Sequence, residues 1–135
     1  LPAACVITPH PGEAARLLEC SVPEVQADRF EAARRLSARF GAVAVLKGAG
    51  TIIAQPNGLL SLCPVAEPGM ASGGMGDVLS GVIAALLAQG LGAADAAQIG
   101  VAVHAFAARA AARAGGARGM LAGDVIDALR AQVNP

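Results

Sequence analysis

The sequence predicts an α/β fold, and three features support this prediction. An all-apolar run at residues 42–46 follows a segment with helical periodicity, which is typical of a buried parallel strand. Two short strand-like runs flank a Pro-Asn-Gly turn at residues 56–58 and predict a hairpin. Helical segments precede these strands and fill the chain after them. We therefore expect a mostly parallel sheet with an antiparallel hairpin at one side.

One strand and two helices are expected before this central run. Residues 3–7 are apolar and end where two prolines and a glycine form a turn. A short helix is expected over residues 13–20. A capping box of Ser21 and Glu24 then starts a longer helix, with apolar side chains every three to five residues as far as Phe40. The solvated side of this helix is expected to carry Arg29, Glu31, Arg34 and Arg35.

The remaining strands and helices follow from turn residues and periodicity. The hairpin strands are expected at residues 51–54 and 59–63, and the residues from 64 to 76 read as a loop because they contain prolines and glycines. Apolar residues at helical spacing predict the last three helices, over residues 77–87, 93–114 and 121–133.

The composition excludes several classes of protein. The 135 residues suit a single domain, and a hydrophobic content of 55% argues against disorder. Ten basic and ten acidic residues cancel, and the absence of Trp and Tyr disfavours nucleic-acid binding. Three cysteines without a CxxC pair suggest buried thiols in a reducing compartment. With neither a spanning apolar run nor a signal peptide, we expect a soluble, cytoplasmic protein, and the start at Leu1 suggests part of a longer chain or a processed one.

The strongest signal for a functional site is a glycine loop, residues 73–76, followed by Asp77 at the start of a helix. Three glycines let the backbone approach a ligand closely, and the positive end of the helix dipole favours a phosphate there. A carboxylate beside that phosphate could take a proton from an attacking hydroxyl. The alternative is a glycine loop in which Asp77 only caps the helix.

A second candidate is the lysine loop, residues 47–51, in which the only lysine of the chain is followed by two glycines and a threonine. A lysine at the end of a buried strand suits a turn that faces phosphate, although an ordinary hairpin with an exposed lysine is the alternative. His10 lies in a rigid turn and is either a ligand-facing residue or a structural or solvated one. His104, in an alanine-rich helix, is interpreted as a core or interface histidine.

Three segments in this order resemble the NAD(P)H-hydrate dehydratases, a carbohydrate-kinase-like family of the ribokinase-like superfamily. They are TPHPGEAARL at residues 8–17, LKGAGT at residues 46–51 and PGMASGGMGDVLSG at residues 68–81. The match extends to RGMLAGD at residues 118–124. The resemblance implies a three-layer αβα ribokinase-like fold. Because the family's domain is longer, residues 1–135 are expected to form a single domain that lacks its first half.

The resemblance implies a lyase that repairs nicotinamide nucleotides. The family dehydrates the S epimer of hydrated NADH or NADPH (NADHX, NADPHX) with ADP, or ATP in eukaryotic members, and releases AMP and phosphate when ADP is used. Carried over to this sequence, Asp77 is the catalytic base, and His10 and Asp77 contact the hydrated cofactor. The residues implied to contact ADP or AMP are Lys47, Gly48, Ala49, Gly50, Thr51 and Gly76. The implied anion hole for the transferring phosphoryl group consists of Gly73, Gly74, Met75 and Gly76.

The resemblance also implies Mg²⁺, which Glu13 would help to order together with phosphate; no direct metal ligand is assigned. Two residues depart from the family pattern, Glu67 in place of Asn and Gly123 in place of Ser. Expected partners are a second copy of the chain, packed through the alanine-rich helix, and an epimerase, fused or separate. Neither nucleic acid nor a membrane is expected.

Two alternative functions stay open on the sequence. One is a ribokinase-like kinase that acts on a sugar or a vitamin precursor. The other is a nucleotide-binding or structural fragment that is catalytically incomplete, because the first half of the family's domain is missing.

Overall fold

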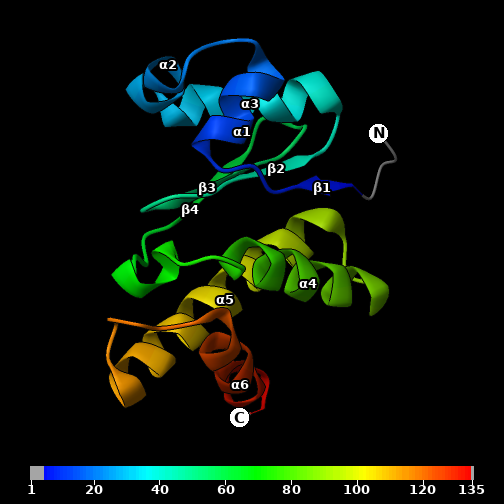
Figure 1. The fold of residues 1–135 in the computed structure, drawn as a ribbon. Coiled ribbons are helices and arrows are strands. Elements are labelled where there is room, and N and C mark those ends of the chain that lie inside the picture. The colour runs from blue at the N-terminus through cyan, green and yellow to red at the C-terminus, as the bar shows by residue number, and fades with distance from the viewer. Residues whose placement is uncertain (1–4, 135) are drawn as a thin grey trace.

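The structure is a computed structural model that describes residues 5–134, and its centre is a four-stranded sheet (Figure 1). The strands lie in the order β1-β2-β3-β4. Their bounds are β1 Val6–Ile7, β2 Val43–Leu46, β3 Thr51–Ala54 and β4 Leu60–Cys63. The expected hairpin of β3 and β4 is confirmed. Of the first expected strand, residues 3 and 4 lie outside the described residues.

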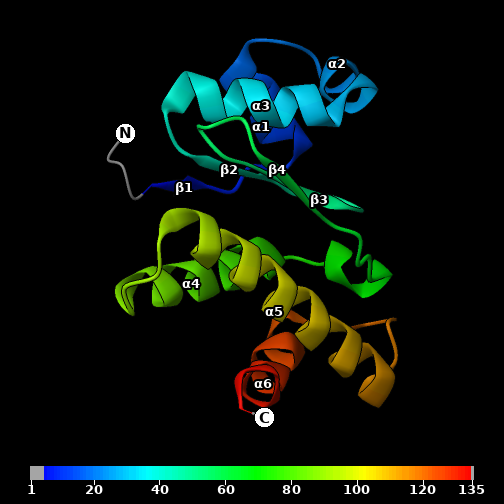
Figure 2. The ribbon, with the colours of Figure 1, turned by 180° about the vertical axis from the view of Figure 1, so that it is seen from behind.

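Helices cover both faces of the sheet, so the expected three-layer α/β architecture is confirmed (Figures 1 and 2). On one face lie α1 (Pro11–Leu18), α2 (Val22–Ala27) and α3 (Arg29–Phe40). On the other side lie α4 (Met75–Ala88), α5 (Ala93–Gly115) and α6 (Ala122–Val133). The last helix packs against α5 rather than against the sheet (Figure 2).

β2 is buried along its whole length because both of its faces are covered. Ala44 and Leu46 belong to the apolar cluster beneath α1 and α3, whereas Val43 and Val45 belong to the cluster beneath α4 and α5. Successive side chains of a strand point to opposite faces, so a strand between two helical layers needs a continuous apolar run. This explains the pattern from which the sequence predicted it.

The expectation of a mostly parallel sheet is wrong for the described part of the chain. Only β1 and β2 pair in parallel, with Val6 opposite Val43. The pairings of β2 with β3 and of β3 with β4 are both antiparallel. Only four residues separate β2 from β3, and a parallel pair needs a crossover of about a dozen residues. The sheet is therefore mixed.

The expected long helix from residue 22 to residue 40 is two helices, broken at Asp28. The Asp28 carboxylate accepts the backbone amide of Glu31 at 2.9 Å and so caps α3. Such side-chain bonds to the backbone compete with helix continuation. As a result Val22 and Phe30 do not share a buried face with the rest, since they are 42% and 44% exposed.

Smaller differences concern boundaries and burial. α1 begins at Pro11 and α4 at Met75, each two residues before the expected start, and a short 3₁₀ helix, Pro68–Ala71, lies in the expected loop. The three cysteines are free but only half-buried, not buried as expected. Within residues 5–134, the helices are all too short or too polar to span a bilayer.

Candidate functional site

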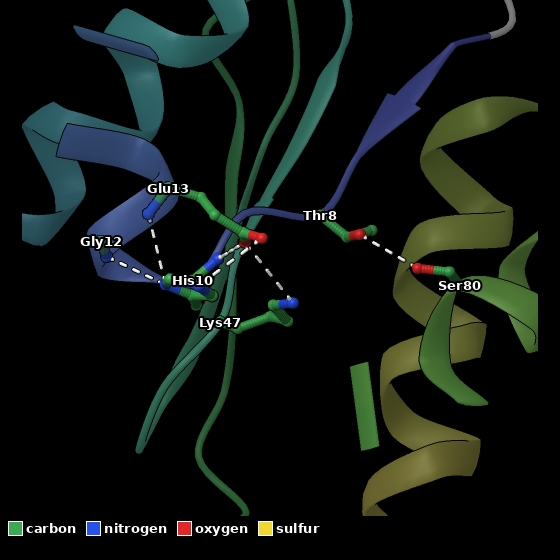
Figure 3. A network of polar contacts seen from close by, with 6 residues as sticks. All are labelled: Thr8, His10, Gly12, Glu13, Lys47 and Ser80. Atoms are coloured by element: carbon green, nitrogen blue, oxygen red, sulfur yellow. Dashed lines mark hydrogen bonds and ion pairs between the residues drawn. The ribbon is translucent and has the colours of Figure 1, made fainter. Parts of the chain in front are cut away.

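The site is built where β1 and β2 end, beside the amino terminus of α4 (Figure 3). Both strands run in the same direction, so the turn around His10 and the lysine loop emerge at one edge of the sheet. The amide of Lys47 donates to the Pro9 carbonyl at 2.9 Å and joins these two segments. The hydroxyls of Thr8 and Ser80, 3.1 Å apart, join the end of β1 to α4.

His10 is the amino-terminal cap of α1. Its Nδ1 accepts the amides of Gly12 at 3.0 Å and Glu13 at 3.2 Å (Figure 3). A ring nitrogen that accepts carries no proton, so the neutral ring carries its proton on Nε2. His10 thus has the structural role of a helix cap, and the part of its ring that a ligand could reach is the half-exposed Nε2 edge, which lies 3.5 Å from Glu13 Oε1.

The Glu13 carboxylate completes this capping box and turns toward the lysine loop (Figure 3). It accepts the His10 backbone amide at 2.7 Å and lies 3.9 Å from Lys47 Nζ. The pKa of Glu13 is lowered, first of all by that backbone hydrogen bond. Burial is the next largest effect and opposes it, and the charges of Lys47, His10 and Arg16 lower the pKa further. Glu13 is thus held ionised beside Lys47.

Lys47 reaches from the lysine loop to the glycine loop. Its side chain is only 25% exposed. A β-carbon built on Gly76 would lie 2.8 Å from Lys47 Nζ, so the ammonium occupies the space that any larger residue would fill. This places a positive charge against the positive end of the α4 dipole, an arrangement that a bound anion would relieve. The sequence predicted both groups, and the structure brings them together.

The amino terminus of α4 is open toward the same region. Gly74 forms its N-cap in the left-handed conformation (φ 85°) and offers no side chain to cap it. Among residues 5–134, no acceptor is found for the amides of Met75 and Gly76, which belong to the orphan donors of the first turn. Asp77, the third residue of the helix, is exposed, and its carboxylate has no hydrogen bond or ion pair in the described chain. The structure thus gives Asp77 no capping role.

The glycine loop is supported from the carboxy-terminal helices. The hydroxyl of Ser72 donates to the Met120 carbonyl at 2.9 Å. A β-carbon on Gly69 would lie 2.8 Å from the Ala117 carbonyl oxygen, which shows how closely the segment before the loop approaches the turn between α5 and α6. Glu67, which departs from the family pattern, accepts the Gly69 amide at 3.4 Å and caps the 3₁₀ helix.

Sequence reasoning misplaced Arg29, which was expected on the solvated side of α3. Its guanidinium lies under the lysine loop and donates to the Ala49 carbonyl at 2.9 Å. Burial lowers the pKa of Arg29. The pattern Asp28-x-x-Glu31 could have shown that a new helix begins here, although not that Arg29 lies under the lysine loop.

His104 is a core histidine, as interpreted, but its position beneath the site was missed. It is 4% exposed, and its Nε2 has no hydrogen-bond partner among the described residues. Burial lowers its pKa; a backbone hydrogen bond with Met75 acts in the opposite direction, and the charge of Lys47 lowers the pKa further. A neutral histidine therefore lies below the first turn of α4.

Known proteins resemble this chain in sequence and in fold. The chain matches the NAD(P)H-hydrate dehydratase family over residues 2–131. It is 56% identical over 130 residues to the bifunctional NAD(P)H-hydrate repair enzyme Nnr of Escherichia coli, covering 96% of this chain and 25% of that protein. It is 45% identical over 126 residues to the ADP-dependent (S)-NAD(P)H-hydrate dehydratase of Neisseria meningitidis, covering 93% of this chain and 43% of that protein.

Solved structures also resemble this chain. The ADP/ATP-dependent NAD(P)H-hydrate dehydratase of Bacillus subtilis, co-crystallised with ATP and Mg²⁺, superposes with a TM-score of 0.88 at 35% identity, over 94% of this chain and 46% of that one. A ribokinase-like superfamily protein of Enterococcus faecalis gives a TM-score of 0.82 at 28% identity, over 99% of this chain and 46% of that one. The chain thus spans from about a quarter to less than half of the length of these four proteins. It belongs to the NAD(P)H-hydrate dehydratase family, within the ribokinase-like superfamily.

Proposed function

We propose that the protein containing this chain is an ADP-dependent NAD(P)H-hydrate dehydratase that acts on the S epimer of hydrated NADH or NADPH. The observation that carries this proposal is the Lys47 ammonium lying against Gly76 at the open amino terminus of α4. The next residue, Asp77, is exposed, and its carboxylate has no partner among residues 5–134. Positive charge and free amides favour a phosphoryl group at this point, and a carboxylate beside it favours a hydroxyl nucleophile. The relatives named for this reaction make it the preferred chemistry.

The proposed reaction has two steps. Asp77 takes the proton from the C6 hydroxyl of the hydrated nicotinamide ring, and that oxygen attacks the β-phosphorus of ADP. The bond from this phosphorus to the bridging oxygen breaks, and AMP leaves with that oxygen. The ring nitrogen then donates its electron pair as the C6–O bond breaks, phosphate departs, and loss of a proton from C5 restores NADH or NADPH. The phosphorylation step is needed because hydroxide is a poor leaving group.

Each predicted site residue has a place in this proposal. Residues 73–76 supply amides as the anion hole, and the lysine loop, with Gly76, contacts the phosphates of the nucleotide. The Thr51 hydroxyl donates to the Gly48 carbonyl at 3.3 Å and so closes the lysine loop. His10 contacts the hydrated ring through Nε2, because Nδ1 is used for the α1 cap.

Magnesium fits this site only through its water shell. Both oxygens of Glu13 already face protein groups, since Oε2 accepts an amide and Oε1 lies 3.5 Å from His10 Nε2. Residues 5–134 contain no cluster of three or more side chains able to ligate a metal directly. Mg²⁺ typically keeps several waters and binds substrate phosphates, so Glu13 would hold one of those waters. The ion would neutralise charge on the phosphates.

The experiment is a coupled comparison of the wild type with Asp77→Asn in the full-length protein. We expect NADH to form from its S hydrate when ADP is present, and the variant to be slower by about 10²–10⁴-fold, the usual contribution of a general base. ADP affinity, measured by calorimetry, should change little. A variant that turns over at the wild-type rate would remove Asp77 from its role.

The kinase alternative predicts a different product. A sugar or vitamin-precursor kinase would accumulate a stable phosphorylated molecule without elimination, which phosphorus NMR of the reaction detects. A catalytically incomplete fragment would show no measurable affinity for ADP or AMP in calorimetry.

Further expectations from the sequence stay predictions. These are a single domain that forms the second half of the family's domain, a cytoplasmic location, an epimerase partner and a homo-oligomer. The exposed Ile99 and Phe106, two turns apart on α5, suit the last of these because both lie on one side of the helix. Light scattering that shows only a monomer would remove it.

A further inference from the structure

We propose that Arg29 is a positioning residue, which orients the amides of the lysine loop and the Lys47 ammonium toward a bound anion. The inference rests on the proposed function for the identity of that anion, a nucleotide phosphate. It concerns a residue outside the three segments that resemble the family.

The guanidinium binds the carbonyl side of the lysine loop. Nη1 donates to the Ala49 carbonyl at 2.9 Å, and Nη2 lies 3.3 Å from the Lys47 carbonyl and 3.4 Å from that of Leu46. The planar fork of an arginine can serve several carbonyls at once, which the single ammonium of a lysine does less well.

These bonds fix the direction of the amides. In a planar trans peptide the C=O of one residue and the N–H of the next point in opposite directions. Because the carbonyls of Lys47 and Ala49 face Arg29, the amides of Gly48 and Gly50 face away from it. For neither amide is an acceptor found in the described part of the chain. The loop therefore presents two free amides on the side opposite the guanidinium.

The Lys47 amide follows the same geometry. The Leu46 carbonyl faces Arg29, so the Lys47 amide should face the other way, and it does: it donates to the Pro9 carbonyl at 2.9 Å. This bond holds the lysine loop against the turn that carries His10. Arg29 and Pro9 thus bind the lysine loop from two sides.

Gly48 shows how closely the guanidinium approaches. Its φ is +152°, and a β-carbon there would lie 2.6 Å from Arg29 Nη2. The close packing leaves Arg29 Nε buried without an acceptor among residues 5–134. The positive φ favours glycine at this position, and the absence of a β-carbon lets the guanidinium lie directly against the loop backbone.

The test measures ADP binding by calorimetry for Arg29→Ala, Arg29→Lys and the matched control Arg35→Ala in the full-length protein. Arg35 lies on the same helix, and its exposed guanidinium makes no hydrogen bond or ion pair in the described residues. We expect Arg29→Ala to weaken ADP binding by about tenfold or more, as hydrogen bonds to a charged group are lost. Arg29→Lys should weaken it less, and Arg35→Ala should leave it unchanged.

A cycle with Lys47→Met separates positioning from a merely structural role. If Arg29 acts in part through Lys47, Arg29→Ala should weaken ADP binding less in the Lys47→Met background than in the wild type, and the loss that remains comes from the loop amides. A structural role would instead lower the melting temperature and leave the affinity of the folded protein as it was. Independent, multiplying effects, or a folded Arg29→Ala protein with wild-type affinity, would overturn the proposal.

Amide hydrogen exchange of the ligand-free proteins keeps this proposal distinct from the proposed function. Exchange at residues 47–51 should be faster in Arg29→Ala than in the wild type and unchanged in Arg35→Ala. A wild type that binds no ADP but shows this pattern would contradict the nucleotide assignment and leave the orienting role of Arg29 in place. Unchanged exchange in Arg29→Ala would overturn that role.

Discussion

The two halves of the candidate site differ in how their backbone groups are used. Around His10 and the lysine loop, most polar groups are bound by the protein itself: His10 Nδ1 caps α1, Glu13 accepts an amide, and Arg29 binds the loop carbonyls, whereas the amides of Gly48 and Gly50 have no acceptor among the described residues. In the glycine loop, the first amides of α4 have no acceptor in the described chain, and Asp77 has no partner. The first half is a preorganised frame, and the second half is open to a ligand. Sites of phosphoryl transfer need both properties.

Gly76→Ala tests the closest point between the two halves. The new β-carbon would lie 2.8 Å from Lys47 Nζ, which is the end of a flexible side chain and will move away at little cost. We expect ADP affinity to fall by about tenfold as the charge leaves the anion site, since a hydrogen bond between charged groups is worth about that factor. Stability should hold or rise, because alanine favours a helix by up to about 1 kcal/mol over glycine.

The matched control for this variant is Gly81→Ala on the same helix. A β-carbon at Gly81 would meet nothing within 4 Å. We expect a gain in melting temperature, since alanine is the better helix former, without loss of ADP affinity. Equal affinities for the two variants would show that the position of Lys47 over Gly76 does not matter for the nucleotide.

The local features of each half could be predicted from the sequence, but the contact between the two halves could not. Residues 47–51 and 73–77 were identified because glycine and charge are local signals of a phosphate site, and β2 was identified because its apolar run is continuous. The approach of Lys47 to Gly76 joins residues 29 positions apart through the packing of α4 on the sheet, which periodicity does not encode. The break at Asp28 is encoded locally, in Asp28-x-x-Glu31, but the apolar spacing from Val22 to Phe40 predicts one long helix.

The tertiary contacts of Arg29 and His104 are still harder to predict from the sequence. An arginine in a helix with four other charged residues is expected to be solvated, and only the tertiary structure brings the lysine loop over it. His104 was correctly taken for a core residue, but its neighbours Met75 and Lys47 come from other elements. Side chains that support a site from behind leave no spacing pattern beside the residues they support.

The hydrogen bond between Thr8 and Ser80 also joins the preorganised frame to the open half of the site. Its loss should have a smaller effect than Gly76→Ala. The hydroxyls lie 3.1 Å apart near the surface. We expect Thr8→Val and Ser80→Ala each to lower the free energy of unfolding by about 0.5–1.5 kcal/mol, the usual range for one hydrogen bond. In urea denaturation the double variant should lose less than the sum of the two, since each single change already removes the bond. Strict additivity would mean that the pair does not hold α4 to the frame.

The smallest expected effect lies inside the frame, at Glu13, and appears as a dependence on pH. Its pKa in the folded protein is lowered from 4.5, chiefly by the hydrogen bond from the His10 amide. The unfolded chain therefore binds this proton more readily. The stabilisation is complete above about pH 4.5 and is lost as the pH falls through the folded pKa. Because the carboxylate is 45% exposed, the effect should stay below about 1 kcal/mol.

Urea unfolding of the wild type and Glu13→Gln, repeated from pH 7 down to pH 3, measures this effect. The wild type should be the more stable at pH 7, and the difference should shrink as the pH falls below about 4.5. Glu24→Gln is the matched control, because Glu24 completes the same kind of capping box with Ser21, and its pKa is lowered first by hydrogen bonds with that serine. Added salt should reduce the Glu13 difference more than the Glu24 difference, because Lys47 lies 3.9 Å from the Glu13 carboxylate. If salt changed both alike, Glu13 would serve only as a helix cap, and the frame would not extend electrostatically to Lys47.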